Sequence, residues 1–179
     1  MVKGIDLGEE YIEYGKEIYG LDLIQNSVFD LPSDEKYDLI IYSHVMEHIL
    51  DPGQHLQKIR HLLSDGGLIY IEVPGVRNLT FNYQADFLKY LQNAHVYSLS
   101  SVTLKNLMEK YGFECVSLSE KVQSLWRPGS VSPTNMTNDF FESLDYLIRL
   151  EQRANYRKMK SFMGSIVDIA RRAKRAVWR

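Results

Sequence analysis

Residues 43–48, which read Ser-His-Val-Met-Glu-His, contain the side chains best suited to chemistry in this sequence. His44 and His48 are four positions apart, so on a helical turn they share a face, and Glu47 stands beside His48. A histidine accepts a proton near neutral pH, and a neighbouring carboxylate increases its basicity. We therefore identify His44 and His48 as candidate catalytic bases. The alternative is that both histidines only cap the loop or pack against it.

The same two histidines raise the question of a metal site. In the zinc-binding pattern His-Glu-x-x-His the glutamate directly follows the first histidine, whereas Glu47 precedes the second one here. No third ligand is evident in the sequence. We therefore expect no metal at this pair.

Two short apolar runs flank this segment and must position it. Residues 38–42 and 68–73 are rich in β-branched and aromatic residues, which predicts two buried strands. Between them, Asp51 stands at an N-cap position and Pro52 at the first helical position, and residues 64–67 (Ser-Asp-Gly-Gly) are expected to end the helix. A helix between two buried strands is a parallel crossover. We therefore predict an α/β fold with its functional residues in the loops after the strands.

This unit resembles the second half of class I S-adenosylmethionine-dependent methyltransferases. The segments that carry the resemblance are YDLIIYS (37–43), HVMEHILDP (44–52) and LLSDGGLIYIEVP (62–74), with Asp65 where the family usually has proline. The resemblance extends over about residues 2–119. It implies a Rossmann-like, mostly parallel sheet with an antiparallel edge hairpin, S-adenosylmethionine as cofactor, and methyl transfer as the activity.

The resemblance also implies roles for individual residues. Asp6, at the end of a short strand, corresponds to the carboxylate that accepts from both ribose hydroxyls of the cofactor. Ser27 stands where the family has the acid that binds the adenine amino group, and Val28 is the candidate for a backbone contact to the ring. The candidate cofactor-binding residues are Asp6, Leu7, Asn26, Ser27, Val28, Ser43 and His44, the last two at the methionine end; the candidate acceptor-binding residues are Glu47, His48 and His95.

The glycine-rich turn of the family is missing from this sequence. Class I methyltransferases open with a strand and a Gly-x-Gly turn, which lets the main chain approach the cofactor. Here Glu9, Glu10 and Tyr11 follow Gly8, where small residues are required. We therefore expect the chain to begin at the family's second strand, as a truncated copy or a fragment. That strand then either pairs directly with the fourth or leaves an exposed strand edge.

The composition is that of an ordinary soluble domain. The chain has 179 residues, of which 45% are hydrophobic and 25% charged, enough for one good core. The single Cys115 excludes an internal disulfide framework and suits a reducing compartment, and we expect it in the core. No run approaches the ~20 apolar residues of a membrane span, and there is no signal-peptide pattern. We therefore expect a cytoplasmic protein.

The C-terminal part differs in charge from the rest. Residues 130–138 predict a linker between a methyltransferase-like domain (1–129) and a helical tail (139–179). Residues 152–179 carry nine Lys or Arg and one acid, whereas the preceding residues carry 12 bases and 22 acids. This basic amphipathic tail, with Trp178 near its end, either docks on the body or a partner or lies on an anionic membrane surface. Nucleic acid is not expected as a partner, because no aromatic side chains suited to base stacking lie among the Lys and Arg residues and the body is acidic.

Together these features predict S-adenosylmethionine-dependent methyl transfer to a small-molecule or saccharide acceptor. The alternative is a non-catalytic module that keeps the fold and binds a partner or an anionic membrane through residues 152–179. A nicotinamide-dependent oxidoreductase is disfavoured, because the sequence has no Gly-x-Gly-x-x-Gly turn.

Overall fold

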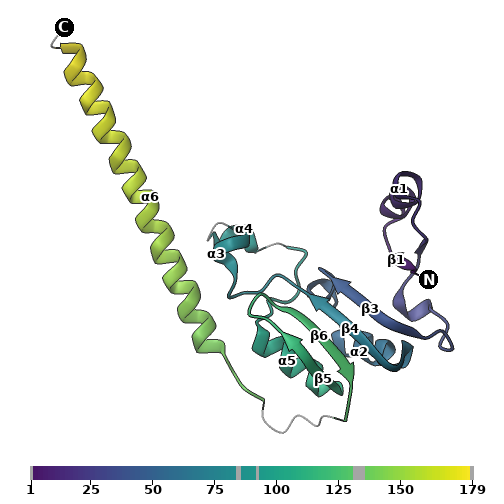
Figure 1. The fold of residues 1–179 in the computed structure, drawn as a ribbon. Helices are drawn as coiled ribbons and strands as arrows, with labels where there is room; N and C mark the ends of the chain where they lie inside the picture. Colours follow the sequence, from purple (N-terminus) through teal and green to yellow (C-terminus); the bar gives the residue numbers. More distant parts are fainter. Residues whose placement is uncertain (1, 84–85, 92, 131–135, 178–179) are drawn as a thin grey trace.

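The computed structural model describes residues 2–83, 86–91, 93–130 and 136–177. They form an α/β body from which one long helix extends (Figure 1). In this part of the chain the strands are β1 (Gly4–Asp6), β2 (Leu23–Gln25), β3 (Tyr37–Ser43), β4 (Leu63–Glu72), β5 (Phe113–Leu118) and β6 (Gln123–Pro128). The helices are α1 (Glu9–Tyr19), α2 (Pro52–Leu62), α3 (Leu79–Asn82), α4 (Phe87–Tyr90), α5 (Ser101–Lys110) and α6 (Phe140–Val177), with short 3₁₀ helices η1 (Val28–Asp30) and η2 (Met46–His48).

The main sheet has four strands in the order β3-β4-β6-β5. β3 and β4 pair in parallel, and α2 connects them, so the predicted crossover is confirmed. β6 runs antiparallel to both β4 and β5, so the hairpin forms one edge of the sheet with β5 outermost. The α/β, Rossmann-like fold class predicted from the sequence is confirmed.

Helix α2 forms where its local sequence predicts it. The Asp51 carboxylate accepts a hydrogen bond from the Gln54 backbone N–H at 3.0 Å, and Pro52 occupies the first turn. Leu56, Ile59 and Leu62 share one face and are fully buried. The helix therefore has a fixed start and a single apolar face that packs on the sheet.

Strand β4 begins five residues earlier than the apolar run predicts. Residues 64–67 do not form a separate turn, because Leu63 already pairs with Tyr37 of β3. The register between the two strands shifts between Tyr37 and Leu39, which accommodates the extra residues of β4, and Gly66 adopts a φ of +79° there. This pairing is non-local, so the apolar run alone does not reveal it.

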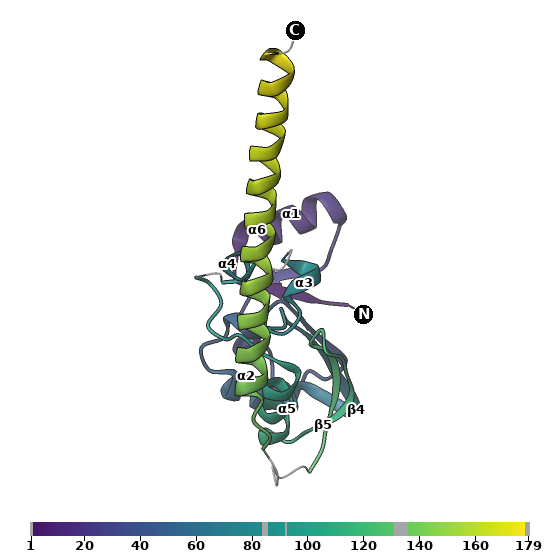
Figure 2. The same cartoon turned by 90° about the vertical axis from the view of Figure 1, so that its left-hand side faces the viewer.

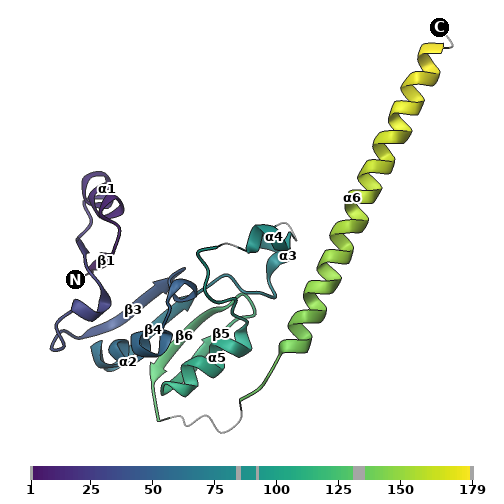
Figure 3. The ribbon, with the colours of Figure 1, turned by 180° about the vertical axis from the view of Figure 1, so that it is seen from behind.

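Only one face of the four-stranded sheet is covered by helices. α2 and α5 lie on that face (Figure 3), and their apolar side chains pack with Ile69, Ile71 and Trp126 in one core. On the opposite face, Leu39 is 51% and Ile41 is 61% exposed. Sheets with parallel crossovers usually bury both faces, so among the described residues this face is an uncovered apolar surface.

β1, β2 and α1 form a small unit beside β3 (Figure 1). β1 and β2 pair in parallel with each other and belong to a different sheet from β3. Among the described residues β1 does not pair with β3, and one edge of β3 stays without a strand partner. The unit is held to the body by Val28 and Leu31, which are buried in the main core.

The prediction that Cys115 lies in the core is wrong. Its side chain is exposed, because β5 is the outermost strand and only Phe113 of this strand is buried. A core position therefore cannot be inferred from residue type alone at a sheet edge.

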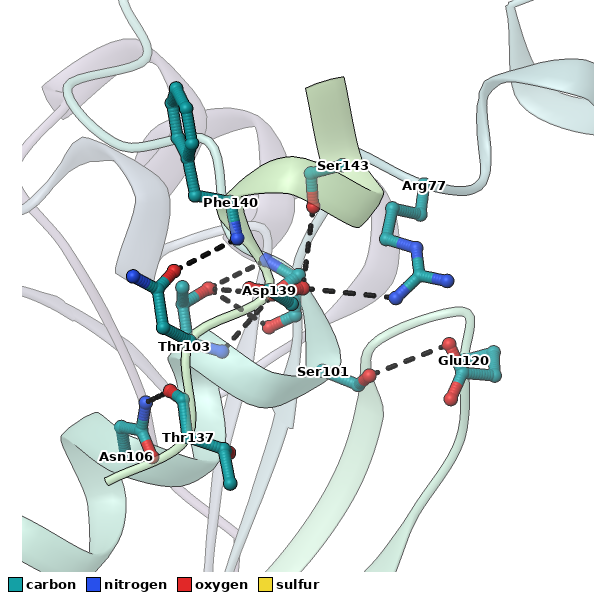
Figure 4. Close-up of polar contacts among 11 residues, drawn as sticks. Arg77, Ser101, Thr103, Asn106, Glu120, Thr137, Asp139, Phe140 and Ser143 are labelled. Atoms are coloured by element: carbon teal, nitrogen blue, oxygen red, sulfur yellow. Dashed lines mark hydrogen bonds and ion pairs between the residues drawn. The ribbon is translucent and has the colours of Figure 1, made fainter. Parts of the chain in front are cut away.

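The start of α6 is anchored to the body by polar contacts (Figure 4). Asp139 is 7% exposed, accepts a hydrogen bond from the Ser143 hydroxyl at 3.3 Å and lies 3.8 Å from the Arg77 guanidinium. The Asn106 side chain donates to the Thr137 carbonyl at 2.7 Å. These contacts connect α5, the loop after β4 and the first turn of α6.

Beyond its first turns α6 leaves the body (Figure 2). Leu150, with Tyr146 and Leu147, packs in a second cluster against residues of α3 and α4, and the helix then continues unbroken through Gly164. The side chains of residues 166, 167 and 169–177, and residues 178–179 entirely, lie outside the described part, so the predicted basic face and Trp178 are not tested. No helix within the described residues is long and apolar enough to cross a membrane.

Candidate active site

His44 lies directly after β3, at the carboxyl end of the sheet. Its backbone N–H donates to the Glu72 carbonyl at 2.8 Å, which continues the ladder in which Ser43 pairs with Glu72. His44 has a φ of +55°, a left-handed conformation that non-glycine residues rarely adopt outside functional or strongly constrained sites. This turn leaves the imidazole 57% exposed at the edge where ligands bind in open α/β sheets.

Glu47 lies beneath the histidines and is 2% exposed. Its Oε1 is 3.4 Å from His44 Nδ1 and 3.9 Å from His48 Nε2. Neither carboxylate oxygen has a hydrogen-bond partner among the described residues. Because a buried carboxylate without hydrogen bonds is strongly unfavourable unless a positive group compensates it, Glu47 defines a place for a proton or a cation.

His48 is fixed by a contact with a distant part of the chain. Its Nδ1–H donates to the Ala94 carbonyl at 2.9 Å, and its ring centroid lies 4.9 Å from that of His95. The Glu47 carbonyl accepts from the backbone N–H groups of Val96 at 2.8 Å and Tyr97 at 3.2 Å. Segment 94–97 is therefore bound to η2, and His95 lies beside the Glu47–His48 pair.

Two tyrosines form part of the wall around this site. Burial raises the pKa of the Tyr90 phenol, and the negative charge of Glu47 contributes in the same direction. Burial also raises the pKa of Tyr83, again with a contribution from Glu47. Both rings pack with Phe87 in the cluster against α6, so this aromatic segment packs against the body as well as bordering the site.

The predicted ribose and adenine residues lie together at the ends of β1 and β2. The Asn26 N–H donates to the Asp6 carbonyl at 3.0 Å. The exposed Asp6 carboxylate accepts through Oδ1 from the Gly8 N–H at 2.7 Å, and Leu7 is 73% exposed. The Ser27 hydroxyl accepts from the Phe29 N–H at 3.3 Å as the cap of η1, while the Val28 side chain is buried in the core. Local hydrogen bonds within these turns therefore already engage some of the atoms predicted to bind the cofactor, namely Asp6 Oδ1 and the Ser27 hydroxyl.

The structure brings the predicted residues into two groups. Asp6, Leu7 and residues 26–28 form the first, and residues 43–48 with His95 form the second. No hydrogen bond or ion pair between described residues joins the two groups. Sequence reasoning missed Ala94 and Tyr97 in the second group, because their contacts with residues 47–50 join distant parts of the chain.

Residues 3–118, about two thirds of the chain, match the family described as methyltransferase domain. The chain belongs to this family. Among curated proteins, an uncharacterized methyltransferase of Staphylococcus carnosus is 26% identical over 101 residues, which cover 55% of this chain and 48% of the relative. The chain thus spans about half the length of that curated relative.

Solved structures of this methyltransferase fold resemble the chain at low sequence identity. A SAM-dependent methyltransferase from Thermotoga maritima has a TM-score of 0.54 at 19% identity and covers 73% of this chain and 69% of its own. The DhpI–SAH complex has a TM-score of 0.51 at 18% identity, and the match covers 72% of this chain and 66% of that chain. These likenesses show the class I Rossmann-like methyltransferase fold.

The two groups of residues fit S-adenosylmethionine only in part. Asp6 is exposed and has one carboxylate oxygen, Oδ2, that no hydrogen bond among the described residues engages, which suits a ribose hydroxyl. The Ser27 hydroxyl is used as a helix cap, and residues 9–11 (Glu-Glu-Tyr) continue into α1 instead of forming a small-residue turn. The described residues therefore include a carboxylate that suits a ribose hydroxyl, and they form no small-residue turn after Gly8.

Proposed function

We propose that this methyltransferase-family chain takes part in S-adenosylmethionine-dependent methyl transfer to a hydroxyl group of a small molecule or saccharide. The observation that carries the proposal is the half-exposed His44 imidazole, with Nδ1 3.4 Å from the buried Glu47 carboxylate. When bound, S-adenosylmethionine supplies an electrophilic methyl group. The residues of the chain have to orient the acceptor and take its proton.

His44 suits proton transfer better than His48 does. His44 Nδ1 lies 3.4 Å from the Glu47 carboxylate and the side chain is 57% exposed, so Nε2 is the nitrogen that we assign to an acceptor hydroxyl. His48 directs Nδ1 to Ala94 and Nε2 toward Glu47, so neither of its nitrogens faces outward. We therefore assign the base to His44 and a positioning role to Glu47, with Asp6 as the ribose ligand.

The test is the formation of S-adenosylhomocysteine by the whole chain at saturating S-adenosylmethionine with a panel of hydroxylated small molecules and sugars. His44→Gln is expected to lower the acceptor-dependent rate by ~10²–10⁴-fold, the usual contribution of a general base. His61→Gln, an exposed histidine on α2, is the matched control and should keep the rate. Absence of acceptor-dependent turnover, or full activity of His44→Gln, would contradict the proposal.

A second candidate function, binding to an anionic membrane surface, is favoured by α6. Its described part carries exposed apolar side chains, among them Phe141 at 76%, Tyr156 at 61% and Phe162 at 68%, and the helix stands away from the body (Figure 1). The exposed bases Arg157 and Lys158 lie in the same stretch. Such a helix can lie in a lipid interface.

Co-sedimentation with vesicles tests this second candidate. Each cation near an anionic surface contributes ~1 kcal/mol, so reversing Arg157 and Lys158 to glutamate should weaken binding to anionic vesicles by at least ~30-fold. Replacement of Lys16 and Lys121, which are exposed on the body, by glutamate should leave vesicle binding unchanged. Equal binding to neutral and anionic vesicles, or equal loss in both double variants, would count against α6 as the membrane contact.

A further inference from the structure

We propose that Glu47, His48 and His95 form a binding site for a divalent transition-metal ion of the Zn²⁺ class. The ligand atoms of these three residues lie within 4.8 Å of one another. Two imidazoles and one carboxylate are a ligand set typical of zinc sites that keep a fourth position open. The sequence shows no third metal ligand near His44 and His48. The fold supplies one for Glu47 and His48 in His95.

The orientation of His48 points to a cation between it and Glu47. Its Nδ1–H donates to the Ala94 carbonyl, so the neutral ring turns the lone pair of Nε2 toward the Glu47 carboxylate, 3.9 Å away. A lone pair facing an anion is unfavourable unless a proton or a metal ion lies between them. A ligating histidine usually donates its other N–H to a carbonyl or carboxylate, which sets its tautomer, and Ala94 provides that contact.

The carboxylate supplies a second and independent observation. Glu47 is 2% exposed, and both of its oxygens lack a hydrogen bond within the described part of the chain. Such a group needs a positive partner. His44 Nδ1 is 3.4 Å from Oε1 and approaches only this oxygen, so the carboxylate keeps capacity to bind a metal ion beside His44.

The backbone around the three residues is already in place. The Glu47 carbonyl accepts from the N–H groups of Val96 and Tyr97, and the Tyr97 hydroxyl donates to the Leu50 carbonyl at 3.1 Å. Zinc bonds of ~2.1 Å in tetrahedral geometry separate ligand atoms by about 3.4 Å. The 3.9 Å between Glu47 Oε1 and His48 Nε2 therefore has to shorten by about 0.5 Å, and the widest separation in the group, at most 4.8 Å, by at most about 1.4 Å.

The choice of metal follows from the ligands. Imidazole nitrogens favour Zn²⁺ and its neighbours in the first transition series, whereas Mg²⁺ and Ca²⁺ prefer sets made only of oxygen ligands. The role of the ion depends on the proposed methyl transfer. A hydroxyl acceptor bound at the open position loses its proton more readily, and His44 is the adjacent base.

The test is calorimetric titration of the chelator-treated full chain with Zn²⁺, without cofactor or acceptor. We expect saturable binding of one ion per chain, and Mg²⁺ should not compete. His95→Gln and Glu47→Gln should each weaken binding by at least ~10²-fold, because loss of even an outer partner of a ligand lowers affinity by ~10–100-fold. His61→Gln, an exposed histidine on α2, should leave the affinity unchanged.

Circular dichroism and thermal unfolding without metal show whether each variant folds. If Glu47→Gln does not fold, the half-buried His95 decides the question, since its replacement by glutamine removes only the ring contacts with His48 and Tyr90. The nitrogen chemical shifts of the imidazoles give a second readout. The chemical shift of His48 Nε2 is expected to change on Zn²⁺ binding. Absence of saturable binding, binding that His95→Gln does not weaken, or an Nε2 of His48 that stays protonated in excess Zn²⁺ would overturn the site.

These outcomes are separable from the proposed function. Metal binding is measured without methyl transfer, so an inactive chain leaves the site intact. Acceptor-dependent methyl transfer that persists undiminished after chelation would contradict the role of the ion in acceptor binding, while leaving methyl transfer itself in place.

Discussion

Titration of this chain with S-adenosylhomocysteine is expected to give a dissociation constant of ~1 mM or weaker. The sequence has no Gly-x-Gly turn, so backbone donors close to the cofactor are absent. Loss of two hydrogen bonds to charged groups, at ~1.5–3 kcal/mol each, weakens binding by ~10²–10⁴-fold. The Ser27 hydroxyl accepts from the Phe29 N–H and offers a single donor, so it does not replace two backbone N–H groups.

Asp6 should account for the binding that remains. Asp6→Ala is expected to abolish detectable binding, since it removes the exposed carboxylate that suits the ribose hydroxyls. Asp22→Ala is the control, because Asp22 is exposed and contacts β1 through its backbone carbonyl, which accepts from the Gly4 N–H. Tight, stoichiometric binding to the unmodified chain would refute the expectation that the donor side is incomplete.

Replacement of Trp126 by alanine is expected to lower the free energy of unfolding by ~3–5 kcal/mol. Trp126 is fully buried and lies on β6 between Ile69 of β4 and Cys115 of β5. Its indole N–H donates to the Ser124 hydroxyl at 2.7 Å, so the substitution leaves a cavity and removes one hydrogen bond of this buried hydroxyl, which still donates to the Ile71 carbonyl at 3.0 Å. Since domains of this size have ~5–15 kcal/mol of stability, the loss is a large fraction of the total.

Urea unfolding followed by circular dichroism measures the effect. Trp126→Phe should retain most of the stability, because it keeps an aromatic ring and loses mainly the indole hydrogen bond. Arg127→Ala, next on the same strand, breaks only an exposed ion pair with Glu114 at 3.0 Å and should lower stability by at most ~1 kcal/mol. A loss for Trp126→Ala no larger than that for Arg127→Ala would show that this core contributes little.

The sequence alone determined the elements that depend on local interactions. α1 runs from Glu9 to Tyr19 and ends at Gly20, whose φ of +61° few other residues adopt. α2 begins at Pro52 because Asp51 caps it. The segments YDLIIYS and HVMEH also carry the resemblance to the methyltransferase family, to which the chain belongs.

Only the tertiary structure decided the contacts between distant segments. β4 starts at Leu63 because of its pairing with Tyr37, and among the described residues one edge of β3 has no strand partner, since β1 pairs with β2. Likewise, the N–H groups of Val96 and Tyr97 bind the Glu47 carbonyl, and this places His95 beside His48 although 47 positions separate them. Periodicity and capping act over a few residues, whereas these contacts depend on how the chain closes on itself, and so the third member of the His-Glu-His group became visible only in the fold.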